Sequence, residues 1–122
     1  MDERRQFIRI PAQLNVEYAV LPSGMTQHSQ TRDVSAGGAC LVTDTPLPPE
    51  TQVQVAIQLP DQPPVNAIAE PVWTTTSDVT GKTQHRRVIE TGVRFAEIAP
   101  RDRERVSRHL RRTLGTEGAS AE

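Results

Sequence analysis

The sequence predicts an all-β domain with one helix: a small antiparallel β-barrel capped by a C-terminal helix. In several segments apolar and polar residues alternate with a period of two, which is typical of strands with one buried face. Proline and glycine clusters separate these segments, and near the end the apolar period changes to four, which indicates a helix. Five or six short strands followed by one helix favour a barrel, because a closed barrel leaves no open sheet edge.

Three strands are predicted in the first part of the chain, at residues 13–20, 27–34 and 39–43. The middle segment is polar, so we expect an edge-like or half-exposed strand there. The clearest alternation follows at residues 53–59 and places on one face Val53, Val55, Ile57 and Leu59.

Two more strands are predicted at residues 65–75, interrupted at Pro71, and at residues 87–95. The polar, glycine-containing segment 74–84 between them is expected to be a long hairpin loop.

A helix is predicted to begin at Pro100 and end at Gly115. Its narrow apolar stripe consists of Val106, Leu110 and Leu114. Residues 11–114 then form the barrel with its helix, residues 1–10 a flexible arginine-rich segment, and residues 115–122 a disordered tail.

Length and composition exclude several classes of protein. A chain of 122 residues fits one domain, and its formal charge of −1 selects no partner class. No apolar run approaches the roughly twenty residues that span a bilayer, and no secretory leader follows Met1, so we expect a cytoplasmic protein. Thirteen of the fourteen basic residues are arginine, whose planar fork suits phosphate or guanine recognition, although a GC-rich genome gives the same bias.

Enzymatic interpretations find no support, and we expect no catalytic residue, metal or cofactor. His28, His85 and His109 are far apart, with no spacing typical of a zinc site. Cys40, the single cysteine, lies in an apolar strand and is expected to be a buried structural thiol. The chain also has no nucleophile elbow and no phosphate-binding glycine loop.

Two segments are unusual enough to suggest a binding site. The first carries Arg4, Arg5 and Arg9 ahead of the first strand, where a flexible basic segment can fold over an anionic ligand. The alternative is a solvated basic leader. The second runs from Asp33 through Ser35 to the Gly37–Gly38 pair.

In the second segment, Asp33 and Ser35 are two residues apart and should point to one side. A carboxylate can accept hydrogen bonds from a guanine edge, a hydroxyl can bind phosphate, and the glycines permit positive φ and close approach of a ligand. An ordinary Asx turn closing a hairpin would have the same sequence.

Taken together, Arg5-x-x-x-Arg9 and Asp33-x-Ser35-x-x-Gly38 resemble the two-part signature of PilZ domains. Later landmarks extend this resemblance over roughly residues 4–114: Pro71-Val72-Trp73, Gly92-Val93-Arg94-Phe95 and the C-terminal helix. The resemblance implies a six-stranded antiparallel β-barrel that binds the bacterial second messenger cyclic dimeric GMP (c-di-GMP).

The same resemblance implies a role for each motif residue. Arg5 and Arg9 grip guanine edges and phosphates, and Arg4 adds to this clamp. Asp33 reads a guanine edge, Ser35 binds phosphate or base, and Gly38 keeps the turn open. One or two ligand molecules per chain are both compatible with it.

Two further residues stay open as site candidates. Trp73 is a second-tier candidate that could stack on a base, while a core tryptophan in the barrel wall is the alternative. Arg94 could face the same surface or be an ordinary exposed strand residue.

We therefore expect a non-enzymatic c-di-GMP receptor that changes conformation on binding and regulates an unidentified protein partner in trans, in motility, biofilm formation or exopolysaccharide export. The arginine-rich helix is either a solvated amphipathic helix, with Glu104 and Arg108 able to pair, or a partner-docking surface. The alternatives are a nucleotide-independent scaffold of the same fold and a small-barrel nucleic-acid binder. Binding of single strands needs aromatic side chains that stack on the bases, and the chain has only four aromatic residues, so no nucleic acid is expected.

Overall fold

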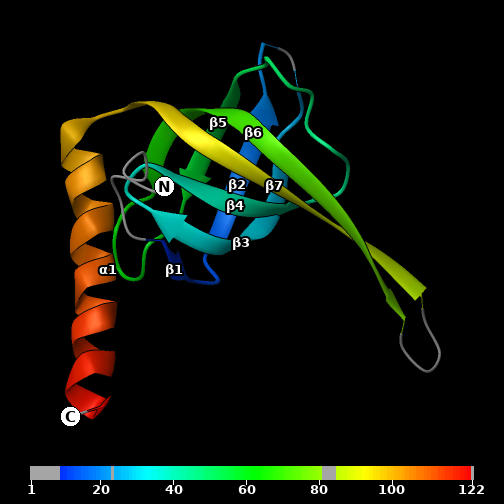
Figure 1. The fold of residues 1–122 in the computed structure, drawn as a ribbon. Helices are drawn as coiled ribbons and strands as arrows, with labels where there is room; N and C mark the ends of the chain where they lie inside the picture. Colours follow the sequence, from blue (N-terminus) through cyan, green and yellow to red (C-terminus); the bar gives the residue numbers. More distant parts are fainter. Residues whose placement is uncertain (1–8, 23, 81–84, 122) are drawn as a thin grey trace, which may run out of the picture.

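The computed structural model describes residues 9–22, 24–80 and 85–121 of the chain. These residues contain seven strands and one helix, joined by loops (Figure 1). The elements are β1 (Ile10–Pro11), β2 (Asn15–Val20), β3 (Gln27–Ser35), β4 (Gly38–Thr43), β5 (Val53–Ile57), β6 (Val65–Thr80), β7 (His85–Ile98) and α1 (Pro100–Ala121). Strands β2–β7 form an antiparallel ring in the order β3-β2-β5-β6-β7-β4, which closes because β4 pairs with β3. The predicted six-stranded barrel with one C-terminal helix is confirmed, and β1 is an extra short strand on β3.

The barrel interior is filled by the apolar side of the alternating strands. The predicted set at residues 53–59 is buried completely: Val53, Val55, Ile57 and Leu59 are at most 1% exposed. In β2, Val16 and Tyr18 are buried, whereas Val20 is only partly so, as is Leu14 just before the strand. Because side chains alternate along a strand, the polar residues between them lie on the outside.

The polar strand β3 lies within the sheet, so the predicted edge-like position is wrong. One side of β3 pairs with β4, and the other pairs with β2 and then β1. The half-exposed part of the expectation is right, because Thr31 and Val34 are buried while Arg32 is exposed. A polar strand is stable in this position because both of its edges have strand partners.

Thr31 bridges the break between β1 and β2. Its hydroxyl accepts a hydrogen bond from the Leu14 N–H (3.0 Å) and donates one to the Ala12 carbonyl (2.6 Å). The side chain is 1% exposed, so these two bonds stand in for strand pairing where water has little access. The hydroxyl therefore joins the short strand β1 to the barrel.

Strands β6 and β7 continue beyond the barrel as a two-stranded arm, which corrects the predicted loop at residues 74–84. Pairing runs from Thr74 with Thr91 to Thr80 with His85, and only residues 81–84 lie outside the described part. Threonine and valine favour an extended backbone, which suits a ribbon whose side chains are exposed from Val72 to Asp78. Figure 1 shows the arm projecting away from the barrel.

The predicted interruption at Pro71 is a register shift between Pro71 and Trp73, and β6 continues through it.

Helix α1 packs against the barrel through Val106 and Leu110, two residues of the predicted stripe, which are 0% and 6% exposed. Among the described residues, no helix is both long and apolar enough to span a membrane.

The ion pair predicted between Glu104 and Arg108 forms on the outer face of α1, with Arg108 Nη2 3.9 Å from Glu104 Oε2. The helix passes Gly115, so the predicted end there and the disordered tail at 115–122 are wrong as far as Ala121. Glycine weakens a helix without ending it, and α1 continues through both Gly115 and Gly118.

Arg105 ties α1 to the loop between β5 and β6, a role that the sequence did not reveal. Its guanidinium donates to the Gln62 side chain (3.1 Å), the Pro63 and Pro64 carbonyls and the Asp102 carboxylate (2.8 Å). The Arg105 side chain is 15% exposed, unlike the exposed arginines of the helix. This arginine is therefore a structural residue.

Replacing Thr31 with valine removes the hydroxyl at nearly constant volume and leaves the Leu14 N–H and the Ala12 carbonyl without their bonds. We expect the free energy of unfolding to fall by about 1–3 kcal/mol, measured by urea denaturation. Thr26→Val, at an exposed position, is the matched control and should change stability by less than about 0.5 kcal/mol. Equal stabilities of the two variants would contradict the bridging role of Thr31.

Candidate functional site

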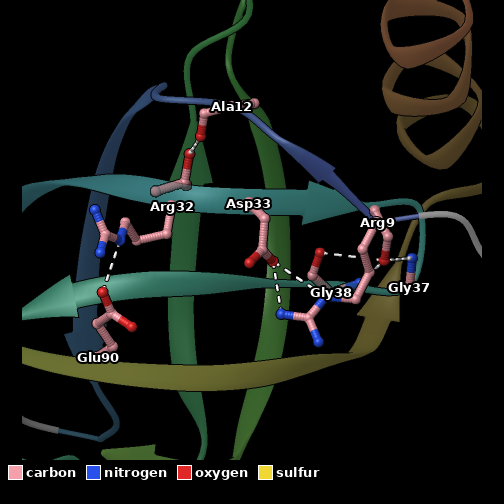
Figure 2. A network of polar contacts seen from close by, with 9 residues as sticks. Arg9, Ala12, Arg32, Asp33, Gly37, Gly38 and Glu90 are labelled. Atoms are coloured by element: carbon pink, nitrogen blue, oxygen red, sulfur yellow. Dashed lines mark hydrogen bonds and ion pairs between the residues drawn. The ribbon is translucent and has the colours of Figure 1, made fainter. Parts of the chain in front are cut away.

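The described part of the predicted site lies where β1 pairs with the end of β3. Arg9 and Asp33 meet there, and Ser35 and Gly38 form the adjoining β3–β4 turn (Figure 2). Arg4 and Arg5 lie outside the described residues. Ile10 is 5% exposed and pairs with Val34, so the chain joins the sheet one residue before the predicted boundary at residue 11.

Arg9 and Asp33 form an ion pair across 24 residues of sequence. The Arg9 Nε and Nη2 donate to the same oxygen, Asp33 Oδ1, at 3.1 and 2.7 Å. This leaves Asp33 Oδ2 without a protein hydrogen bond among the described residues. The side chains are 33% and 26% exposed, so the pair is open to a ligand while its geometry is held.

Ser35 organises the turn between β3 and β4. Its Oγ accepts hydrogen bonds from the Gly37 and Gly38 N–H groups, both at 3.1 Å, and donates a longer one to the Gly38 carbonyl at 3.4 Å. The serine hydroxyl thus does the work that the alternative interpretation assigned to an Asx turn. Ser35 is 7% exposed.

Gly38 is required by close packing of the backbone. A Cβ at this position would lie 2.2 Å from the Val93 carbonyl oxygen on β7. The expectation of positive φ at the motif glycines is wrong, because no glycine in the described ranges has positive φ. The same turn is fixed on the β7 side by the Phe95 N–H, which donates to the Gly37 carbonyl at 2.8 Å.

Strand register aligns Asp33 with Trp73 in one row across four strands. Asp33 pairs with Cys40, Cys40 with Gly92, and Gly92 with Trp73. Directly opposed residues of antiparallel strands share a face. The next row along, Val34–Ala39–Val93, is part of the core. The row from Asp33 to Trp73 therefore lies on the outer face of the barrel.

A second outer row begins at Ser35 and passes through Gly38 to Arg94 and Glu70. Arg94 is exposed and forms an ion pair with Glu70. Of the two interpretations left open for Arg94, the register supports the one in which it faces the same surface as Asp33 and Ser35.

Trp73 covers Gly92 from outside the barrel. A Cβ on Gly92 would lie 2.2 Å from Trp73 Cε2, so only glycine lets the indole lie this close to the sheet. Trp73 is 38% exposed, which rules out the core position considered from sequence. Each outer row holds one glycine, Gly92 beside Cys40 and Gly38 beside Arg94.

Sequence reasoning missed a second ion pair beside the first. The Arg32 Nε lies 2.6 Å from Glu90 Oε2, on the same side of the sheet as Arg9 and Asp33 (Figure 2). Arg32 immediately precedes Asp33 in the motif, which was the available signal. With Arg94 and Glu70, three arginine–carboxylate pairs line this face.

Cys40 lies in the same outer row and is 2% exposed, as the prediction of a buried thiol requires. Burial raises the pKa of the thiol to about 11, and the charges of Asp33 and Glu90 add to this, against smaller opposing effects of Arg9 and Arg32. A thiol with this pKa is almost entirely protonated at neutral pH and is a poor nucleophile. Among the described residues, no group of three or more histidine, cysteine, aspartate or glutamate side chains could hold a metal ion.

Solved structures with this fold come from several bacterial proteins. The PilZ domain of YcgR from Escherichia coli, determined with c-di-GMP, is 18% identical, covers 98% of this chain and 97% of its own, and has a TM-score of 0.69. Bacillus subtilis MotI/DgrA, an inhibitor of motility, is 21% identical over 93% of this chain, with a TM-score of 0.71. The MrkH–c-di-GMP complex of K. pneumonia is 16% identical over 98% of this chain, with a TM-score of 0.73.

This chain spans about half of the solved MotI/DgrA and MrkH chains, 52% and 55%. No curated protein matches it. The family model of the PilZ domain matches residues 3–112, which include both halves of the motif and the whole barrel. The chain therefore belongs to the PilZ domain family.

Proposed function

We propose that this protein binds c-di-GMP on the outer face of its barrel and acts as a non-enzymatic receptor that regulates a protein partner in trans. The observation that carries the proposal is the Arg9–Asp33 pair, which joins the two motif halves at one end of the outer row that runs to Trp73. YcgR and MrkH, which have the same fold, were solved with c-di-GMP. The regulated process would be motility, biofilm formation or exopolysaccharide export.

The guanine bases and the phosphates of c-di-GMP both match groups at this site. Guanine presents a ring N–H and an amino group, and the two carboxylate oxygens of Asp33 can accept from both together. The Arg9 fork can donate to guanine acceptors or to a phosphate. Because the ion pair already restrains both side chains, less side-chain entropy would be lost when they bind a ligand.

Ser35 and Gly38 have different roles in this proposal. The longest bond of Ser35, to the Gly38 carbonyl at 3.4 Å, can be exchanged for a bond to a ligand phosphate or base while the hydroxyl still accepts from the turn. Gly38 acts by letting β7 approach the turn, as the Val93 distance requires.

Arg4 and Arg5 complete the clamp in this proposal. Binding orders residues 1–10 against the barrel and so changes the shape and charge of that face. A partner that prefers one state then binds or leaves, to the extent that its affinity differs between the two states. Amide exchange of residues 4–10 tests this step: slower exchange at saturating c-di-GMP is expected, and unchanged exchange would contradict it.

Calorimetric titration with c-di-GMP, beside GTP, tests the ligand. We expect selective binding that is lost in the double variant Arg5→Ala/Arg9→Ala. Arg9→Ala alone removes charged hydrogen bonds of about 1.5–3 kcal/mol, which corresponds to a rise in the dissociation constant of about 10- to 100-fold. Arg9→Lys keeps the charge without the planar fork and should restore only part of the affinity.

Arg87→Ala is the matched control, because Arg87 is also exposed but lies on the arm, next to Asp78. It should bind as the wild type does. Absence of binding by the folded wild-type protein would overturn the proposal in favour of the nucleotide-independent scaffold. Oligonucleotide binding with a steep salt dependence would instead favour a nucleic-acid binder.

Trp73 offers an independent readout because it is the only tryptophan and lies in the same row as Asp33. We expect c-di-GMP to shield the indole, so acrylamide quenching of its fluorescence should decrease at saturation and follow the calorimetric isotherm. Trp73→Ala should weaken binding by about 1–3 kcal/mol if the indole stacks on a base. Unchanged quenching at saturation would exclude Trp73 from the site.

A further inference from the structure

We infer that the arm is a self-association surface: the open edge of β6 pairs with the same edge of a second copy of this chain. The inference rests on the fold and does not depend on the proposed ligand. In the barrel β6 has two neighbours, but β5 pairs with it only as far as Ala69. From Glu70 to Thr80 its only strand partner in the described part of the chain is β7. Figure 1 shows this stretch away from the barrel.

An open strand edge presents alternating unpaired N–H and C=O groups that can template pairing with another chain. Proteins usually blunt such an edge with charge, proline or shortness. Between Val72 and Thr80 there is no proline, no basic residue and one acidic residue, Asp78, which lies 3.8 Å from Arg87 on β7. Six of these nine residues are β-branched, which favours an extended backbone.

The other edge of the arm differs. Within the arm, β7 lacks a second strand neighbour from His85 to Val88, because β4 pairs with it only from Ile89 to Arg94. These four residues have the sequence His-Arg-Arg-Val. The β7 edge is thus short and basic, whereas the β6 edge is long and almost uncharged. Only the β6 edge is suited to pairing.

Two exposed apolar side chains at the base of the arm are consistent with a partner covering this edge. Val72 and Trp73, at the base of the arm, are 57% and 38% exposed. Of the large hydrophobic residues exposed in the described ranges, these two share one strand, and Met25 is the third. A strand added along β6 would pass beside both.

The β6 sequence itself favours a second copy in antiparallel orientation. A two-fold pairing centred on Thr75 places these residues opposite each other: Thr75 and Thr75, Thr74 and Thr76, Trp73 and Ser77, Val72 and Asp78. Threonine pairs stabilise adjacent strands, and no like charges meet. Parallel pairing in register would instead place Asp78 against Asp78. The antiparallel arrangement is an isologous interface in which one edge serves both copies, with the barrels at opposite ends of the paired arms.

The test uses the full chain and the double variants Thr74→Lys/Thr76→Lys and Thr74→Glu/Thr76→Glu. Each places like charges opposite each other across the proposed two-fold axis. Sedimentation equilibrium from about 10 µM to about 1 mM should give a dimer for the wild type. In each variant the dimer dissociation constant should rise by about tenfold or more, while circular dichroism stays that of the wild type.

Mixing the two variants should restore a dimer that contains one copy of each, because opposite charges then face each other. Gln27→Lys/Gln54→Lys is the matched control: it adds the same charge at two exposed positions of strands β3 and β5 and should leave the dimer intact. A wild type that is monomeric over the whole range would overturn the inference. So would lysine and glutamate variants that dimerise as the wild type does, or a mixture of weakened variants that fails to recover.

Discussion

Pairing between β3 and β4 is the constraint on which the rest of this structure depends. It turns an open sheet of six strands into a ring, so every barrel strand gains a neighbour on both sides. The turn that makes this possible holds its shape through the Ser35 hydroxyl and allows β7 to approach within the space that Gly38 leaves. Residues that belong to the binding motif are therefore also the residues that close the barrel. A change at either position is expected to alter stability and binding together, which is why the arginine variants are the cleaner test of function.

The outer face beside this turn is arranged around charges that are balanced within the chain. Asp33 is paired with Arg9, Glu90 with Arg32 and Glu70 with Arg94. None of these carboxylates is an unpaired charge that needs a ligand for stability. In the proposed function, an anionic, hydrogen-bonding ligand would exchange some of these internal bonds for bonds to itself, so its affinity would depend on the difference between the two sets. Such an exchange requires partial exposure, and the 33% and 26% exposure of Arg9 and Asp33 provides it.

The same sheet extends from this face into the arm. Trp73 lies at the junction: its indole covers Gly92 in the outer row that starts at Asp33, and its backbone belongs to the edge of β6 that has no second strand neighbour among the described residues. Below the junction the barrel is held by a buried apolar core. Beyond it, the ribbon depends on backbone pairing and on exposed threonines, with few buried contacts. A partner strand along β6 would supply the second set of backbone bonds that the barrel strands already have.

Patterns in the sequence alone were enough to predict most of the strands, the helix and the residues of the motif. The alternation at residues 53–59 identified a strand and its buried face, and the change of period identified α1. The spacing of Arg9, Asp33, Ser35 and Gly38 predicted a site, and in the fold Arg9 bonds to Asp33 and Ser35 to Gly38. Local periodicity reports which face of a strand is buried, but it carries no signal where both faces are exposed. Residues 74–78 are all exposed, so this Thr-rich part of the arm had the sequence pattern of a loop. Nor does local periodicity report which strands become neighbours. Only barrel closure put β3, β4, β7 and β6 side by side, which aligned Asp33 with Trp73 and brought Arg32 to Glu90. These contacts join residues up to 58 positions apart, and only the closed ring of backbone hydrogen bonds sets their register.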